Sequence, residues 1–297
     1  MTEAPLHRPV LVDEVLTHLA AGPGARVLDC TLGLGGHAEA LLARGVRLVG
    51  VDRDPQARAL ARERLAAFSD RLDIVGGSYA TVAEGFAKAG ERFDAVLADL
   101  GVSSMQLDDD ARGFGLHSDA PLDLRMGPDG EDARALIDRL DENELADVIF
   151  QYGEERLSRR IARAIKRDRA AGRLETARDL GESVRRTVAG HQQRHPAMRT
   201  FQALRIAVND ELGQLDRLLA ALPTLLAPGG RAAVISFHSL EDRRVKESFR
   251  AGKTAGAYVA IAKKVVTASE AELAVNRRAS SAKLRWAVAA DATPHTA

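Results

Sequence analysis

Residues 27–38 read VLDCTLGLGGHA, an apolar strand pattern that runs directly into a glycine loop and the start of a helix. Gly33, Gly35 and Gly36 let the backbone approach a ligand closely, and a helix N-terminus supplies free N–H groups. Asp52 ends the next apolar run, where a carboxylate can accept hydrogen bonds from both hydroxyls of a ribose. Because Asp29, the glycines and Asp52 coincide, the pattern predicts an adenosine-containing cofactor rather than a tight turn without a ligand.

The loop by itself leaves two cofactors open. Gly33-x-Gly35-x-x-Ala38 fits the dinucleotide fingerprint G-x-G-x-x-G/A, which suggests NAD. Asp29 stands directly before the loop, where it would face a pyrophosphate but can pair with an ammonium group. S-adenosylmethionine carries such an ammonium group and no phosphate. The sequence therefore favours S-adenosylmethionine, with NAD as the alternative.

The first hundred residues alternate between strand and helix patterns. Buried strands are expected at residues 25–30, 47–52, 72–75 and 93–99, and helices at residues 37–44, 55–68 and 79–89. Asp54 and Pro55 form a typical helix start, because Asp caps a helix and Pro favours its first position. This alternation predicts an α/β protein with a parallel sheet and helices on both faces.

The rhythm breaks after Asp99. Residues 105–130 are rich in Gly and Pro, residues 131–222 are helical in pattern, and a turn at 228–230 precedes another buried strand at 231–237. Segments 258–266 and 283–288 are expected to complete the sheet as an antiparallel edge. We therefore expect residues 1–104 and 211–297 to form one domain, with an inserted, mostly helical substrate-recognition domain at 105–210.

Charge is segregated along the chain, although 42 basic and 42 acidic residues cancel overall. Residues 104–150 carry a net charge of −9, whereas residues 151–205 and 243–285 each carry +8. Two basic blocks suit a folded polyanion, and solvated helix faces are the alternative.

The composition is that of a globular protein, with 45% hydrophobic and 28% charged residues. No apolar run approaches the roughly 20 residues of a membrane helix, and residues 1–18 do not resemble an export signal. Cys30 is the only cysteine, which excludes an intrachain disulfide and a cysteine-ligated zinc site. We expect a cytoplasmic protein without a metal or a membrane partner, in which Cys30 packs as a small apolar side chain.

Motifs in order along nearly the whole chain resemble the MraW (RsmH) family. The matching stretches are residues 7–11 (HRPVL), 29–37 (DCTLGLGGH), 99–104 (DLGVSS), 106–109 (QLDD), 112–114 (RGF), 121–126 (PLDLRM), 152–155 (YGEE), 199–205 (RTFQALR), 235–242 (ISFHSLED) and 281–285 (SAKLR). The family comprises bacterial methyltransferases that use S-adenosylmethionine to modify the N4 atom of a decoding-centre cytidine in 16S ribosomal RNA.

The resemblance implies a Rossmann-like methyltransferase domain with an inserted helical domain. It also implies that the small ribosomal subunit is the partner, and it leaves the oligomeric state open. The cofactor residues that it implies, together with Asp29 and Gly33 from the loop argument, are Asp29, Gly33, Gly35, Gly36, His37, Asp52, Tyr79, Asp99 and Gln106.

The chemistry suggests further candidates. The exocyclic amine of cytosine needs an acceptor for its proton, and Asp99 ends a strand where such an acceptor would lie, although Asp99 can also serve the cofactor alone. Aromatic side chains that could stack on the base are Phe114, Phe201 and Phe237, although each is more typical of a core. The remaining substrate candidates are Arg199 and His238, the latter with helix capping as its alternative. Phosphate contacts are expected from Arg156, Arg159, Arg160, Arg163, Lys166 and Arg167.

Two other function classes remain open at this stage. An NAD-dependent dehydrogenase would need a paired acid and base beside a hydride-accepting pocket, and the sequence contains no such constellation. A non-catalytic RNA-binding module would be expected to have lost Asp29, Asp52 or Asp99, and all three are present.

Overall fold

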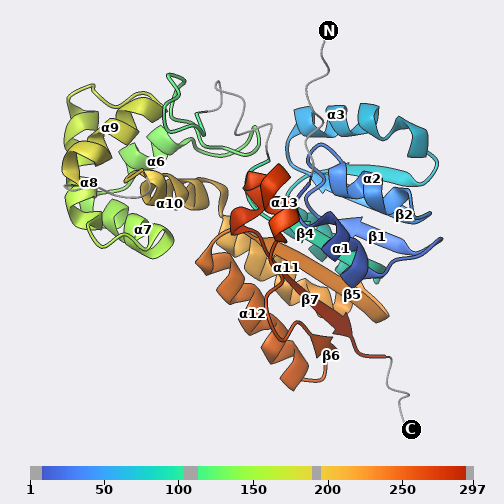
Figure 1. Cartoon of the computed structure of the whole chain (residues 1–297). Coiled ribbons are helices and arrows are strands. Elements are labelled where there is room, and N and C mark those ends of the chain that lie inside the picture. The colour runs from blue at the N-terminus through green and yellow to red at the C-terminus, as the bar shows by residue number, and fades with distance from the viewer. Residues whose placement is uncertain (1–8, 104–112, 189–194, 292–297) are drawn as a thin grey trace. The chain divides into compact units, whose positions relative to one another are not determined.

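The computed structural model describes residues 9–103, 113–188 and 195–291. The chain forms two compact units (Figure 1). The first, called the sheet unit here, comprises Met1–Gly101 and Leu212–Ala297, and the second, the helical unit, comprises Val102–Glu211. The expected boundaries at 104/105 and 210/211 lie within a few residues of these limits.

A seven-stranded sheet forms the centre of the sheet unit, in the order β3-β2-β1-β4-β5-β7-β6. Strands β1 to β5 are mutually parallel, and β7 is antiparallel to both β5 and β6. The expected antiparallel edge is thus confirmed for β7, whereas β6 runs in the same direction as β1 to β5. The strands are β1 (Arg26–Asp29), β2 (Arg47–Asp52), β3 (Leu72–Gly76), β4 (Phe93–Asp99), β5 (Leu226–Ser236), β6 (Tyr258–Ile261) and β7 (Lys283–Ala289).

Helices cover both faces of this sheet, as the alternating pattern predicts. One face packs against α1 (Val12–Leu19), α2 (Gly36–Leu42) and α3 (Pro55–Arg64). The other packs against α4 (Tyr79–Lys88), α11 (Glu211–Leu225) and α12 (Ser239–Thr254). Successive residues of a strand point alternately into the two cores, so both sets are apolar and the strands appear in the sequence as continuous apolar runs. The short helix α13 (Glu270–Val275) precedes β7.

A local signal sets the start of α3. The Asp54 side chain accepts a 2.9 Å hydrogen bond from Gln56 N, and Pro55 is the first residue of α3, as expected. The expected turn at 228–230 is different in the structure, because β5 already begins at Leu226 and passes through these residues. Gly229 has φ 69° where the register against β4 shifts, so the Pro-Gly-Gly stretch forms an irregularity within the strand.

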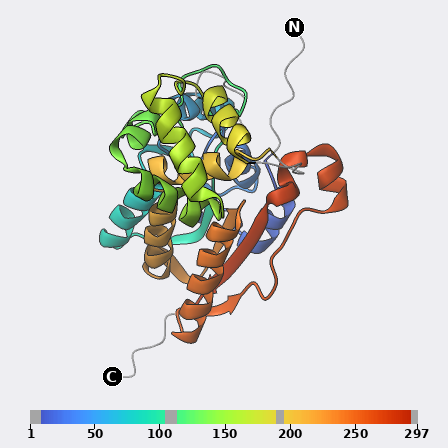
Figure 2. The same ribbon diagram turned by 90° about the vertical axis from the view of Figure 1, so that its left-hand side faces the viewer.

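The helical unit contains α6 (Ala133–Arg139), α7 (Glu142–Gly153), α8 (Ser158–Ala170), α9 (Ala177–Thr187) and α10 (Met198–Asn209). With α11, they confirm the helical pattern expected over residues 131–222. Figure 2 faces these helices, which surround a core of their own. Asn209 is buried and fixes the preceding turn-rich segment, since it donates to Leu124 O at 2.7 Å and accepts from Met126 N at 2.8 Å.

None of the helices in the described ranges is both long enough and apolar enough to span a bilayer.

Candidate cofactor site at the carboxyl edge of the sheet

Three aspartates end three adjacent strands of the sheet unit. Asp29 ends β1, Asp52 ends β2 and Asp99 ends β4. These strands are parallel and in the order β2-β1-β4, so their carboxyl ends meet at one edge, about 4.8 Å apart from strand to strand. The strand order reverses between β1 and β4, and ligands of open α/β sheets bind in the crevice at such a reversal.

Packing against neighbouring side chains limits which residues the glycine loop can contain. Gly33 has φ 52° and Gly35, the N-cap of α2, has φ 79°. A Cβ atom at Gly35 would lie 2.8 Å from Cδ1 of Leu65, and one at Gly36 would lie 3.0 Å from Cγ of Pro9. In the sequence, close approach to a ligand is enough to account for these glycines. The structure adds that a side chain at Gly35 or Gly36 would crowd Leu65 or Pro9.

Asp52 is held in place by backbone donors. Its Oδ2 accepts from Gly33 N at 2.9 Å, and its Oδ1 accepts from Asp54 N at 2.8 Å. Burial raises the pKa of Asp52, and these two N–H groups oppose that rise. The carboxylate is therefore oriented, and each of its oxygens keeps a lone pair for a further donor such as a ribose hydroxyl.

Beside the loop, buried Asp29 and His37 lie next to the partly exposed Asp99. His37 Nε2 lies 3.4 Å from Asp99 Oδ2, and Asp29 Oδ1 accepts from Thr31 N at 3.1 Å. Thr31 also accepts a 2.6 Å hydrogen bond from the backbone N–H of Asp99 through its hydroxyl oxygen. Thr31 was not among the sequence candidates. Its position in the loop directly after a buried strand is the signal that points to it.

The charges of this group favour a cationic ligand. Asp29 is 1% exposed, and burial raises its pKa to about 6. His37 and the Thr31 N–H act in the opposite direction and lower this pKa. Asp29 Oδ2 and Asp99 Oδ1 are buried and accept no hydrogen bond from any described residue. Two free acceptors among three carboxylates fit the ammonium group and the positive sulfur of S-adenosylmethionine, whereas a pyrophosphate would be repelled.

Two predicted cofactor residues remain, of which the structure describes one. Tyr79 is the first residue of α4 and packs, partly buried, against the core. Gly77, two residues earlier, donates its N–H to Asp52 O at 3.2 Å, which brings this segment to the end of β2. Gln106 lies outside the described residues. Cys30 is buried in the core of the sheet unit, as expected.

The substrate candidates belong to both units: Phe114, Arg199 and Phe201 lie in the helical unit, and His238 lies in the sheet unit. Phe114 and Phe201 are only 8% and 7% exposed and belong to the core of the helical unit, so neither presents a face for a base to stack on. His238 is the N-cap of α12 and accepts from Glu241 N, which is the capping alternative. The Arg199 side chain is 60% exposed and donates to Glu154 O at 3.1 Å.

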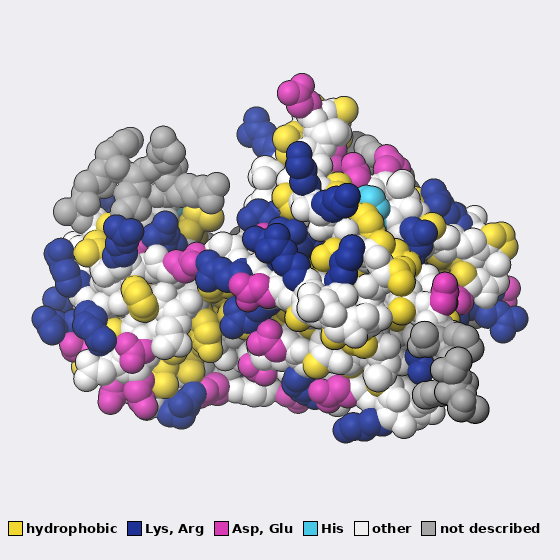
Figure 3. All heavy atoms as spheres, turned by 90° about the horizontal axis from the view of Figure 1, so that it is seen from below, with side chains coloured by type: hydrophobic (Ala, Val, Ile, Leu, Met, Phe, Trp, Pro, Cys, Tyr) yellow, Lys and Arg dark blue, Asp and Glu magenta, His cyan; other side chains and the backbone are white. Residues whose placement is uncertain are grey.

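The six basic side chains expected to contact phosphates lie on α8 or just before it, and several have partners within the helical unit. Lys166 donates to two carbonyl oxygens at the end of α6, at 2.7 and 2.8 Å, so it caps that helix. Arg159 and Arg163 lie within 3.2 Å of carboxylates on α7. On the face in Figure 3, basic and acidic side chains of the helical unit, at the left, lie interspersed. The net charge of +8 therefore does not form a continuous basic surface on this face.

The sheet order, the glycine loop after β1 and the three carboxylates at neighbouring strand ends define a Rossmann-like methyltransferase that uses S-adenosylmethionine. The sequence profile of the MraW methylase family matches residues 4–290, and the chain belongs to this family. The expected family is thus confirmed. The chain is an enzyme, and the alternatives of an NAD-dependent dehydrogenase and a non-catalytic module are not supported.

Curated relatives are similar over nearly their whole length. Ribosomal RNA small subunit methyltransferase H of Deinococcus deserti is 48% identical over 287 residues, which cover 96% of this chain and 94% of that protein. The protein of the same name from Deinococcus radiodurans is 50% identical over 281 residues (94% and 88%). The one from Sorangium cellulosum is 49% identical over 286 residues (95% and 90%).

Proposed function

We propose that this methyltransferase modifies the exocyclic N4 atom of a decoding-centre cytidine in 16S ribosomal RNA, and that its substrate is the small ribosomal subunit rather than naked RNA. The observation that carries the proposal is the full-length similarity to proteins named ribosomal RNA small subunit methyltransferase H. The carboxylates of Asp29, Asp52 and Asp99 at three neighbouring strand ends agree with it. The two separated basic blocks favour a folded polyanion as substrate.

The cofactor supplies a methyl group on a positively charged sulfur. Asp29 pairs with its ammonium group through the free Oδ2, and Asp52 accepts hydrogen bonds from its ribose hydroxyls. Gly33, Gly35 and Gly36 bring backbone close to it, and Tyr79 forms a wall for its adenine. Gln106 completes the site by family resemblance, and the buried ring of His37 positions the cofactor from the first turn of α2.

Asp99 acts on the nucleophile. The N4 lone pair of cytosine is delocalised into the ring, and a hydrogen bond from N4 to a carboxylate localises it and provides an acceptor for the departing proton. Asp99 Oδ1 has no donor among the described residues, and the backbone of Asp99 is fixed by Thr31. The orientation of the reacting groups supplies the rest of the acceleration, because a single in-line displacement needs no covalent help.

The helical unit serves as the RNA-recognition domain, through phosphate contacts more than through stacking. Phe114 and Phe201 are committed to its core, and the whole chain has only 4% aromatic residues. Exposed arginines such as Arg156 and Arg199 remain available for phosphates. Affinity for RNA should accordingly depend steeply on salt.

The test compares three RNA substrates under identical conditions. Labelled methyl groups from S-adenosylmethionine are offered to small subunits from cells lacking this modification, to 16S RNA stripped of protein, and to transfer RNA as a control. The proposal expects incorporation into the subunits only. Equal rates on stripped 16S RNA would overturn the subunit requirement, and incorporation into transfer RNA alone would overturn the proposed substrate.

A further inference from the structure

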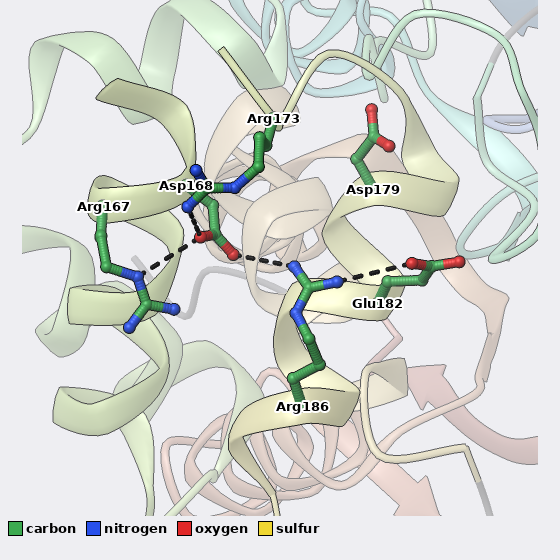
Figure 4. A pocket seen from close by; sticks show the side chains of 6 residues that line it. All are labelled: Arg167, Asp168, Arg173, Asp179, Glu182 and Arg186. Carbon is green, nitrogen blue, oxygen red and sulfur yellow. Dashed lines mark hydrogen bonds and ion pairs between the residues drawn. The ribbon is translucent and has the colours of Figure 1, made fainter. Parts of the chain in front are cut away.

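A buried carboxylate in the helical unit is surrounded by three arginines (Figure 4). Asp168, near the end of α8, is 2% exposed and accepts hydrogen bonds from Arg173 Nη2 at 2.8 Å and Arg186 Nη2 at 3.0 Å. Ser183 on α9 donates its hydroxyl to the same carboxylate at 2.7 Å, and Arg167 Nε lies 3.4 Å away. One side chain thus organises donors from α8, from the loop after it and from α9.

The three arginines carry more positive charge than the single carboxylate of Asp168 neutralises. Burial tends to raise the pKa of Asp168, but the hydrogen bonds from Arg173, Ser183 and Arg186 hold it well below its usual range, so the carboxylate is charged. One guanidinium would neutralise it. The three arginine side chains are 64%, 56% and 50% exposed for Arg167, Arg173 and Arg186, so their outer edges face solvent.

The guanidinium groups line a cavity of about 620 Å³. Its lining consists of Arg167, Asp168, Arg173, Asp179, Glu182 and Arg186, all of them charged.

The other two acids of the lining leave part of the donor set free. Asp179 accepts hydrogen bonds from Glu175 N and Thr176 N at the start of α9, at 3.1 and 2.9 Å. Among the described residues, Glu182 pairs with Arg186 alone, at 3.5 Å. Both Nη atoms of Arg167, and the Nε and Nη1 atoms of Arg173, make no hydrogen bond to any residue that the structure describes.

We propose that the Arg cluster (Arg167, Arg173 and Arg186) is a binding site for a phosphate group of the RNA backbone, with Asp168 as the residue that holds the guanidinium groups in place. The planar fork of N–H donors on an arginine matches the oxygens of a phosphate. The inference rests on the proposed function, because it takes the RNA substrate as the source of the phosphate.

The first test measures the salt dependence of binding to small subunits that lack the modification. The double variant Arg173→Gln/Arg186→Gln should reduce the slope of log affinity against log salt by about 1 for one lost phosphate contact. The matched control is Arg139→Gln/Arg178→Gln, which removes the same charge from two exposed, ion-paired arginines of the same unit. The control should leave the slope unchanged. Equal slopes for wild type and the Arg173/Arg186 variant, or equal losses in both variants, would overturn the site.

A second variant separates a built site from diffuse charge attraction. Asp168→Asn removes a negative charge, so diffuse attraction would tighten RNA binding. The proposal expects on the order of tenfold weaker binding, because the arginines lose the group that orients them. Unchanged or tighter binding by a variant with a native circular dichroism spectrum would contradict it. If Asp168→Asn does not fold, the salt dependence of Arg173→Gln/Arg186→Gln decides whether the site exists.

Turnover distinguishes this inference from the proposed function itself. At saturating subunits, the Arg173/Arg186 variant should show a raised KM with little change in kcat, since a phosphate contact made equally in the ground state and the transition state contributes only to binding. Wild-type protein that neither binds nor methylates subunits would defeat the proposed function. Wild-type activity with an unchanged KM in the variant would defeat only the phosphate site.

Discussion

The backbone N–H of Gly33 donates a 2.9 Å hydrogen bond to Oδ2 of Asp52 and thereby joins the glycine loop to the end of β2. The glycine loop and the acid proposed to bind the ribose of the cofactor are thus one connected unit. A second bond, from Asp54 N to Oδ1 at 2.8 Å, fixes the other oxygen. The carboxylate is oriented before any ligand arrives.

Replacing Asp52 tests this arrangement. In Asp52→Asn the amide NH₂ must face the N–H of either Gly33 or Asp54, so one hydrogen bond becomes a contact between two donors. Hydrogen bonds to charged groups contribute about 1.5–3 kcal/mol, so we expect the Kd for S-adenosylmethionine to rise by at least about tenfold. Isothermal titration calorimetry measures it, with the exposed Asp70→Asn as control. Equal affinities for Asp52→Asn and wild type would exclude the ribose role.

Asp29 makes the stability of the ligand-free protein depend on pH. Burial raises its pKa to about 6, so the folded state favours the protonated carboxyl, and stability falls as pH rises from the ordinary value of 3.8 to about 6. The wild-type free energy of unfolding, relative to Asp29→Asn, should fall by about 2 kcal/mol over this window and level off above about pH 7. Urea unfolding from pH 4 to pH 7 measures this difference. Parallel curves for the two proteins would show that Asp29 titrates normally.

The same titration should govern cofactor affinity in the opposite direction. Only the ionised Asp29 attracts an ammonium group, so the affinity for S-adenosylmethionine should decline as pH falls below about 6. Asp29→Asn should bind weakly and without this pH dependence. A wild-type affinity that is constant between pH 5 and pH 7.5 would contradict the pairing.

Gly35 offers a prediction with a matched control. Gly35 and Gly90 have similar positive φ values, 79° and 74°, but a Cβ atom at Gly35 would lie 2.8 Å from Leu65, whereas nothing lies within 4 Å at Gly90. Gly90→Ala should lower the free energy of unfolding by about 1 kcal/mol, which is the cost of a positive φ at a residue with a side chain. Gly35→Ala should lose about 1–3 kcal/mol more, because the added methyl group overpacks the core. Equal unfolding midpoints for the two variants would show that Leu65 moves aside freely.

The strands and the cofactor edge were predictable because their signals are local. Apolar runs that end in Asp29, Asp52 and Asp99 are visible in the sequence, and parallel topology brings their ends together. The sequence left Phe114 and Phe201 open between a core position and base stacking, and packing within the helical unit, which the sequence does not reveal, places both in its core. The Asp168 cluster depends on how α8 and α9 pair, so its arginines look like ordinary surface charge in the sequence.

Asp99→Asn separates a role in proton transfer from a role in cofactor binding. The amide keeps the size of the side chain but is a poor proton acceptor, so kcat should fall by about 10²–10⁴-fold. The affinity for S-adenosylmethionine should change by less than about tenfold, because Asp29 and Asp52 remain. Single-turnover methyl transfer and calorimetry measure the two quantities. A loss of activity explained fully by weaker cofactor binding would assign Asp99 to the cofactor alone.

The central claim is tested most directly by identifying the methylated nucleoside. Small subunits lacking the modification are incubated with the enzyme and labelled S-adenosylmethionine, and the 16S RNA is digested to nucleosides for mass spectrometry. The account predicts that the label is found in N4-methylcytidine, at one stoichiometric position. Label in another nucleoside, or no label under conditions where cofactor binding is demonstrated, would contradict it.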